Sequence, residues 1–243
     1  MLAVENQGFE IIPELFDQRR ISSVIESLDA SPVRRSRAGV RNALRINSVR
    51  DLATDSKLLN IASSVLGGNA VPFRATLFEK SLHANWLVVW HQDTTLPLRE
   101  RRDVKGWGPW SVKEGVICAH APAYALEQVL AIRIHLDHSN EQNGSLRVLR
   151  RAHTLGVLSD DAIHDLANKI PAVDCHVAAG GVLLMKPLLV HSSSKPNLTL
   201  LTGVCFTLST QLAYPLWTAS NSALGYATRS SSLTSLHVQS HRR

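Results

Sequence analysis

Short segments rich in Val, Leu and Ile follow one another between residues 71 and 191, and they constrain the fold more than any other feature. They read VPFRATLFEK, NWLVVW, EGVICAH, VLAIRIHLD, SLRVLRR, AVDCHVA and GVLLMKPLLVH, and Gly, Asn and Pro signals separate them. Such lengths and compositions are typical of β-strands. Many short strands with few helices predict a mainly β protein: a sandwich, a jelly roll or a small barrel.

Helical signals lie mostly before this region. We expect a short strand at Phe9–Ile12, a helix from Pro13 to about Leu28, and a helix LLNIASSVL that Asp55 or Ser56 caps and Gly67-Gly68 ends. One more helix is expected among the strands, over Ser159–Lys169, because Ser159 can cap it and two acids stand in its first turn.

Length and composition favour a single globular domain of moderate size. The chain has 243 residues, of which 44% are hydrophobic and 19% are charged. It has no apolar run near the roughly 18–20 residues of a membrane span, and its first residues do not resemble a secretory signal. Cys118, Cys175 and Cys205 are scattered and form no CxxC pair. We therefore expect reduced thiols and a cytoplasmic protein that does not enter a membrane.

The net charge of +6 does not indicate nucleic-acid binding, because it is concentrated at the end of the chain. From Cys175 onward there are five Lys or Arg and no Asp or Glu, which leaves the first 174 residues with a net charge of +1. A phosphate-binding surface would be expected in the folded body, with aromatic residues interleaved. We expect a small-molecule substrate instead, and the sequence predicts no oligomeric state.

One pair of polar residues stands directly after an apolar run, in WHQD. Residues two apart on a strand face the same side, so His91 and Asp93 could reach one cavity. By itself the pair is as consistent with ordinary surface residues. His191 ends a second apolar run a hundred residues later, and two His with one carboxylate match the facial triad of non-haem iron(II) oxygenases. A structural zinc site would need a fourth protein ligand, and none is evident.

Several motifs together resemble the phytanoyl-CoA dioxygenase family of iron(II)/2-oxoglutarate oxygenases, and its bacterial members above all. They are WHQD, FRATLFEKS, QNGSLRVLRRAH and LLVHSSSK, and the resemblance covers about residues 8–195. It implies a double-stranded β-helix, which is a cupin-like jelly roll, with helices flanking one sheet. It also implies hydroxylation of a small organic substrate, coupled to conversion of 2-oxoglutarate to succinate and carbon dioxide.

The resemblance further implies roles for individual residues. His91, Asp93 and His191 would bind Fe(II), and Thr76 and Ser193 match positions that contact the cosubstrate 2-oxoglutarate, with dioxygen as the oxidant. A cosubstrate contact is also expected near Arg133, although the face of the strand that carries it could instead be solvated. We interpret Arg74 and Lys80 as surface charges, and the run RERRDVK as a solvated loop over the mouth of the site.

The chain departs from the family after residue 195. The family carries an Arg roughly ten residues past the second His, where its planar fork pairs with the distal carboxylate of 2-oxoglutarate. Here the stretch PNLTLLTGVCFTLSTQL contains no Arg or Lys. Arg133 could substitute only in part.

A shift of reading frame accounts for this departure. If GVCFTLSTQL is encoded GGC GTG TGC TTC ACA TTG AGT ACG CAG CTC after an ACC codon for Thr202, reading from one nucleotide earlier gives RRVLHIEYAA, an Arg-bearing strand. Our hypothesis is therefore a jelly-roll domain with N-terminal helices over 1–195 and a divergent, frameshifted tail over 196–243. We expect the tail to be partly disordered, from about Thr218 onward.

Three readings of function stay open from sequence alone. The first is an iron(II)/2-oxoglutarate dioxygenase whose activity the aberrant C-terminus impairs. The second is an inactive metal-binding jelly roll or pseudogene product, and the third is a cupin-like ligand-binding module. A divergent but functional C-terminus is the alternative to the frameshift.

Overall fold

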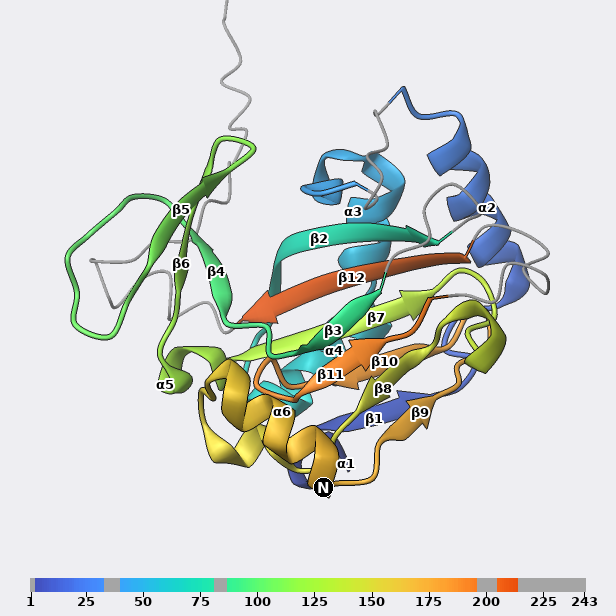
Figure 1. Ribbon diagram of the computed structural model, residues 1–243. Coiled ribbons are helices and arrows are strands. Elements are labelled where there is room, and N and C mark those ends of the chain that lie inside the picture. Colours follow the sequence, from blue (N-terminus) through green and yellow to red (C-terminus); the bar gives the residue numbers. More distant parts are fainter. Residues whose placement is uncertain (1–2, 33–39, 81–86, 196–204, 214–243) are drawn as a thin grey trace, which may run out of the picture.

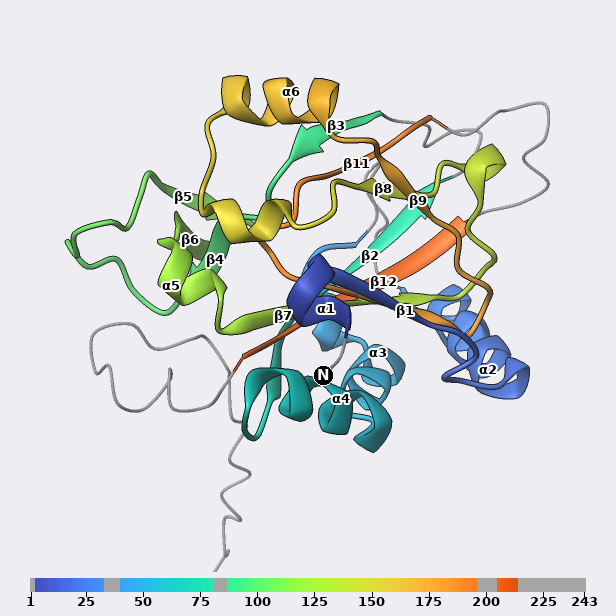
Figure 2. The ribbon, with the colours of Figure 1, turned by 90° about the horizontal axis from the view of Figure 1, so that it is seen from below.

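Two facing β-sheets form the body of the molecule (Figures 1 and 2). The computed structural model describes residues 3–32, 40–80, 87–195 and 205–213. Its strands are β1 Phe9–Ile12, β2 Val71–Lys80, β3 Val88–His91, β4 Thr95–Leu98, β5 Trp110–Lys113, β6 Val116–His120, β7 Val129–His135, β8 Leu146–Val148, β9 Val173–Cys175, β10 Val182–Met185, β11 His191–Ser193 and β12 Cys205–Ala213. Its helices are α1 Ala3–Gln7, α2 Gln18–Asp29, η1 Ala43–Arg45, α3 Asn47–Ala53, α4 Ser56–Leu66, α5 Ala123–Leu126, η2 Glu141–Asn143, η3 Ala152–Leu155 and α6 Asp160–Lys169.

The larger sheet has the strand order β1-β10-β7-β12-β2, and the smaller one has the order β3-β11-β8-β9. Neighbouring strands in both are antiparallel. Chain neighbours are rarely sheet neighbours, because the chain crosses repeatedly between the two sheets. This arrangement is the double-stranded β-helix, and it confirms the predicted mainly β jelly roll.

Alternation along the strands assigns each face of the larger sheet. On β7, Leu130, Ile132 and Ile134 are buried against α2, α3 and α4, which cover the outer face. Ala131 points the other way and packs with Leu146 and Val148 of the smaller sheet. The sheets therefore enclose a second core between them, and side chains on the inner face of β7 and β2 point into the barrel.

Local signals set most of the helix boundaries. Asp55 caps α4 by accepting a hydrogen bond from the Lys57 amide, and Gly67 ends that helix in the left-handed region at φ 74°. Ser159 caps α6 by accepting from the Ala162 amide. Both helices match the sequence prediction. The first predicted helix is shorter than expected, since a turn occupies Pro13–Phe16 and α2 starts only at Gln18.

A third, three-stranded sheet of order β4-β6-β5 stands at one end of the barrel (Figures 1 and 2). Its strands β4 and β6 pack on α5 through a separate apolar cluster that includes Leu96, Leu98 and Leu126. The RERRDVK run lies in the loop between β4 and β5, where most of its residues are exposed, as predicted. In the described part of the chain, no helix has the length and apolar character that crossing a membrane requires.

The C-terminal region is described only over β12. This strand lies between β7 and β2, with Ser209 opposite both Arg133 and Thr76. The expected disorder from Thr218 onward concerns residues outside the described ranges, as does the segment 196–204. The division into 1–195 and 196–243 stays a prediction.

Candidate metal centre

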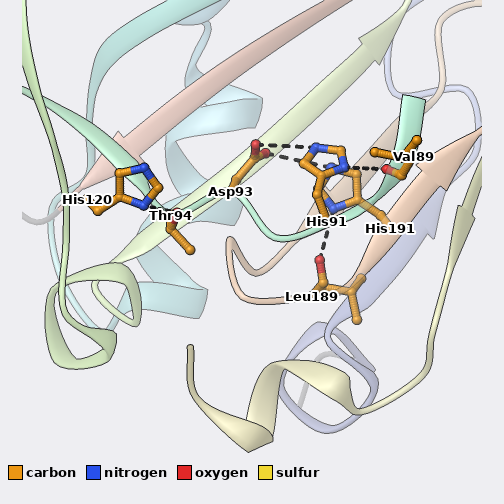
Figure 3. Close-up of polar contacts among 7 residues, drawn as sticks. All are labelled: Val89, His91, Asp93, Thr94, His120, Leu189 and His191. Carbon is orange, nitrogen blue, oxygen red and sulfur yellow. Dashed lines mark hydrogen bonds and ion pairs between the residues drawn. The ribbon is translucent and has the colours of Figure 1, made fainter. Parts of the chain in front are cut away.

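Three side chains converge where β3 and β11 meet. His91 ends β3, Asp93 follows two residues later, and His191 begins β11 directly opposite His91. One ligand atom from each lies within 4.8 Å of the others (Figure 3). The antiparallel register brings together two residues that are a hundred positions apart in the chain. The three side chains that meet here are the ones that the sequence analysis named as candidate metal ligands.

Both imidazoles are held in the tautomer that a metal requires. Nδ1 of His91 lies 2.8 Å from the Val89 carbonyl oxygen, and Nδ1 of His191 lies 2.9 Å from that of Leu189. A carbonyl can only accept, so Nδ1 carries the proton in each ring. Nε2 is then left with its lone pair, and the hydrogen bond fixes the orientation of the ring, as is usual for metal-binding histidines.

The Asp93 carboxylate faces both free nitrogens without bonding to either. Its two oxygens lie 3.9 Å from Nε2 of His91 and 3.9 Å from Nε2 of His191. These distances exceed a hydrogen bond, so the donor atoms surround a space rather than satisfy one another. Two neutral nitrogens and one carboxylate oxygen suit a divalent transition metal and leave further coordination positions open.

Electrostatics keep Asp93 and His191 ready to bind a cation. Burial acts to raise the pKa of Asp93, but attraction to His191, His91, Arg74 and Arg133 outweighs it and lowers the pKa below its usual value. Burial depresses the pKa of His191 to about 4, although Asp93 opposes this. The carboxylate is therefore charged and the buried imidazole neutral at pH 7, which are the protonation states that metal binding needs.

Gln92 anchors the turn that carries the two neighbouring ligands, a role that sequence reasoning missed. Its side-chain nitrogen donates to the carbonyls of Gly156 at 2.9 Å and Leu188 at 2.7 Å. Its oxygen accepts from the Leu158 amide at 2.8 Å. The side chain points away from the metal centre and is buried. Gln92 thus links the turn to the segment that precedes His191. Its position between the two candidate ligands in the HQD motif was the sequence signal that could have identified this role.

The predicted cosubstrate residues lie on three strands around the same interior. Ser193 is buried two residues beyond His191, and its hydroxyl donates to the Gly144 carbonyl at 2.8 Å. Thr76 is buried on β2, between Ala75 and Leu77, which face the covering helices. Thr76 therefore points into the barrel. It stands in one cross-strand row with Arg133, since both lie opposite residue 209 of β12.

Arg133 lies inside the barrel rather than on a solvated face. Its guanidinium carbon is 5.1 Å from the centre of the Phe78 ring, and its charge reaches Asp93 and His191. His135, two residues further on the same face, is 3% exposed. Burial and the charge of Arg133 lower its pKa to about 3, so it is neutral at physiological pH.

Arg74 differs from its expected role as a surface charge. It is half-buried on β2, and it contributes to the lowered pKa of Asp93. Its neighbours Ala75 and Leu77 pack under the helices, so Arg74 lies on the inner side of the strand near its beginning. A single sequence cannot show this, because the same alternation would suit an exposed edge strand. Of Lys80 only the backbone position is described.

Comparison with known proteins identifies the family. Residues 26–200 match the family described as phytanoyl-CoA dioxygenase (PhyH). The chain belongs to the phytanoyl-CoA dioxygenase family. As a member it is an iron(II)/2-oxoglutarate-dependent dioxygenase by class, and its His-Asp-His group is consistent with that class. No curated protein sequence matches the chain.

Solved structures share the fold of this family member at low sequence identity. AviO1 from Streptomyces viridochromogenes Tue57 is 21% identical with a TM-score of 0.61, over 87% of this chain and 92% of AviO1. HygX from Streptomyces hygroscopicus, with nickel and 2-oxoglutarate bound, is 16% identical with a TM-score of 0.61, over 93% of both chains. The epimerase SnoN, in complex with Fe3+, alpha-ketoglutarate and nogalamycin RO, is 16% identical with a TM-score of 0.63, over 86% of this chain and 80% of SnoN.

Proposed function

We propose that His91, Asp93 and His191 bind Fe(II), and that the enzyme hydroxylates a small organic substrate with 2-oxoglutarate as cosubstrate. The observation that carries this assignment is the geometry of the three donors. They lie within 4.8 Å of one another, and each imidazole donates Nδ1–H to a backbone carbonyl, which leaves Nε2 free. Two proteins that share the fold support this choice: SnoN holds Fe3+ with alpha-ketoglutarate, and HygX holds nickel with 2-oxoglutarate.

The protein residues would orient the reactants and exclude water. When bound, iron with its cosubstrate supplies the oxidising chemistry, which side chains lack. Three protein ligands on one face leave room for the cosubstrate and dioxygen. The buried His191 closes the centre on the barrel side, while the partly exposed His91 and Asp93 leave it accessible from the mouth.

We further propose that Thr76, Arg133 and Ser193 contact 2-oxoglutarate. A guanidinium can pair with a carboxylate through two parallel hydrogen bonds, and Arg133 offers one inside the barrel. Thr76 and Ser193 add hydroxyls on the neighbouring strands. In this form of the chain, Arg133 substitutes in part for the family's Arg beyond the second His, which the stretch PNLTLLTGVCFTLSTQL lacks.

Metal and cosubstrate binding test the assignment directly. Under anaerobic conditions, Fe(II) and 2-oxoglutarate together should give the visible charge-transfer band of their chelate, and a titration of that band gives both affinities. His91→Ala, Asp93→Ala and His191→Ala should each abolish the band. His164→Ala is the matched control, because this exposed imidazole lies on α6. An unchanged band in the three ligand variants would refute the metal site.

Substitution of Arg133 tests the cosubstrate contact separately. Removing one partner of a buried charge pair costs about 2–5 kcal/mol, so Arg133→Gln should weaken 2-oxoglutarate binding by a few tens to thousands of fold. Fe(II) affinity should change little. Equal 2-oxoglutarate affinity in Arg133→Gln and the unaltered chain would remove Arg133 from the site.

A second candidate is a metal-binding protein that does not turn over, and the lack of Arg or Lys in the stretch PNLTLLTGVCFTLSTQL after Lys195 favours it. Succinate formation from 2-oxoglutarate, with Fe(II) and ascorbate, separates the two. Iron binding without succinate would support the inactive protein. Ligand binding that survives loss of both His91 and His191 would instead support a cupin-like binding module.

We also propose that the reading frame changes near Lys195–Pro196, so that 1–195 is the native domain and 196–243 an out-of-frame tail. The absence of acids after Asp174 and the missing Arg support this. The coding nucleotides decide it: a single-base change must restore the Arg-bearing strand, and if none does, the proposal fails.

The location of the protein is a separate proposal. Buried free thiols at Cys118 and Cys175 support a reducing compartment, the cytoplasm.

A further inference from the structure

A cationic cleft lies between the barrel and the three-stranded sheet. The space that it offers to water-sized molecules is about 80 Å³. Arg41 and Asn42 line it from the segment before η1, and Phe73 and Arg74 from β2. The strands of the three-stranded sheet contribute Pro97, Lys113, Val116 and Cys118. Three of its lining side chains are cationic, and among the described lining residues none is acidic.

The cleft adjoins the proposed metal centre through two separate connections. Arg74 lines the cleft, and its charge also reaches Asp93. Strand β4 begins two residues after Asp93. Its residue Pro97, four positions after Asp93, lines the cleft. Arg74 and the chain from Asp93 to Pro97 therefore connect the cleft to the proposed metal centre, and a molecule held in the cleft would have to extend toward it.

The lining has the composition of a site for an organic anion. Arg41 and Lys113 are exposed and Arg74 is half-buried, so their like charges repel one another in a partly enclosed space. An anion between them would replace this repulsion with charge-assisted hydrogen bonds. Phe73, Pro97 and Val116 provide apolar surface for the rest of such a molecule.

We propose that this cleft binds the anionic group of the primary substrate, a carboxylate or a phosphate ester, through Arg41, Arg74 and Lys113. The group would fix one end of the substrate and direct the remainder toward His91, Asp93 and His191. This inference rests on the proposed function, because it names the substrate class of the same site.

Matched pairs of small probes test the charge requirement. Hexanoate is compared with hexanamide, and hexyl phosphate with hexanol, by titration against intrinsic tryptophan fluorescence. The anions should bind at least about tenfold more tightly than their neutral partners, since hydrogen bonds to charged groups are the stronger ones. Their affinity should fall as salt is added. The two arms distinguish a carboxylic acid from a phosphate ester. Equal affinity for charged and neutral probes would overturn the proposal.

Variants locate the binding. Arg41→Ala combined with Lys113→Ala should weaken anion binding several-fold or more, while Lys105→Ala, an exposed cation of the β4–β5 loop outside the cleft lining, should not. Equal anion affinity in the double variant and the unaltered chain would place the anion elsewhere and refute the cleft.

The probe titrations are repeated without Fe(II), and 2-oxoglutarate binding is measured separately. Anion binding that persists without metal would support the cleft even if the iron assignment failed. If the Arg41 and Lys113 substitutions weakened 2-oxoglutarate binding as much as probe binding, the cleft would be the cosubstrate site, and the proposal would be wrong.

Discussion

The buried imidazole of His135 should make the stability of the protein depend on pH in a calculable way. In the folded chain its pKa is about 3, because burial and the charge of Arg133 both disfavour the protonated ring. In the unfolded chain it returns to about 6.5. Between these values the unfolded state binds the extra proton. The stability that the neutral ring contributes is thus complete above pH 6.5 and is lost as the pH falls toward 3.

The magnitude at pH 5 follows from this difference. A pKa offset of one unit corresponds to about 1.4 kcal/mol, so lowering the pH from 7 to 5 should cost about 2 kcal/mol through His135. This value depends on the unfolded pKa alone, as long as the folded pKa stays well below 5. The ring is 3% exposed, so solvent screening reduces the effect little.

Urea unfolding at pH 7 and pH 5 measures this contribution. Other groups also titrate, so the quantity of interest is the difference between the unaltered chain and His135→Leu, both free of metal. The variant should lose about 2 kcal/mol less between the two pH values. His164→Leu should keep the full loss, because the buried imidazole is retained. An equal loss with and without His135 would refute the reasoning.

Four further perturbations probe the scaffold and the site. Gly180→Ala would place a Cβ 2.1 Å from the Phe16 carbonyl oxygen at a φ of 83°, and should cost about 3 kcal/mol or more in urea unfolding. Gly67→Ala, with φ 74° and nothing within 4 Å, should cost only about 1–2 kcal/mol. Burial raises the pKa of Cys175 to about 12, so its thiol should resist alkylation at pH 8 until the protein unfolds. Gln92→Ala should lower the unfolding free energy by about 1–3 kcal/mol, because it leaves buried backbone groups without their partners.

The parts of the fold that the sequence predicted well depend on local signals. The strand VPFRATLFEK coincides with β2, and the helix capped by Asp55 ends at Gly67. The convergence of His91, Asp93 and His191 was also predictable, because HxD after an apolar run and His at the end of another apolar run are short patterns. Alternation along a strand then brings their side chains to one cavity.

Features that depend on distant packing could not be predicted. The run GVLLMKPLLVH looks like one strand, but it contains β10, a turn and the start of β11. Leu188, Leu189 and Val190 in that turn are buried, so a buried turn has the same composition as a strand. The position of Arg74 in the cleft could not be predicted for a related reason. The segments that form this cleft are far apart in the sequence and meet only after folding.

Strand β12 shows how a sheet can be completed without the side chains that a function requires. Its backbone pairs with β2 and β7 over Cys205–Ala213, and such a ladder uses N–H and C=O groups that every residue except proline provides. Its presence therefore does not distinguish an in-frame tail from an out-of-frame one. The charge of the longer stretch that leads into it does, because PNLTLLTGVCFTLSTQL after Lys195 carries no Arg or Lys.

The positive charge near the metal ligands consequently comes from the strands on either side of β12. Among the described residues, Arg74 on β2 and Arg133 on β7 are the cations whose charge reaches Asp93. A chain whose frame is restored by one base would carry an Arg in place of Val204, directly before β12 in the sequence, and another in place of Gly203. If either Arg holds the distal carboxylate, the restored chain should bind 2-oxoglutarate more tightly by about 2–5 kcal/mol. Equal affinity of the two chains would mean that Arg133 alone suffices and that the altered tail does not impair cosubstrate binding.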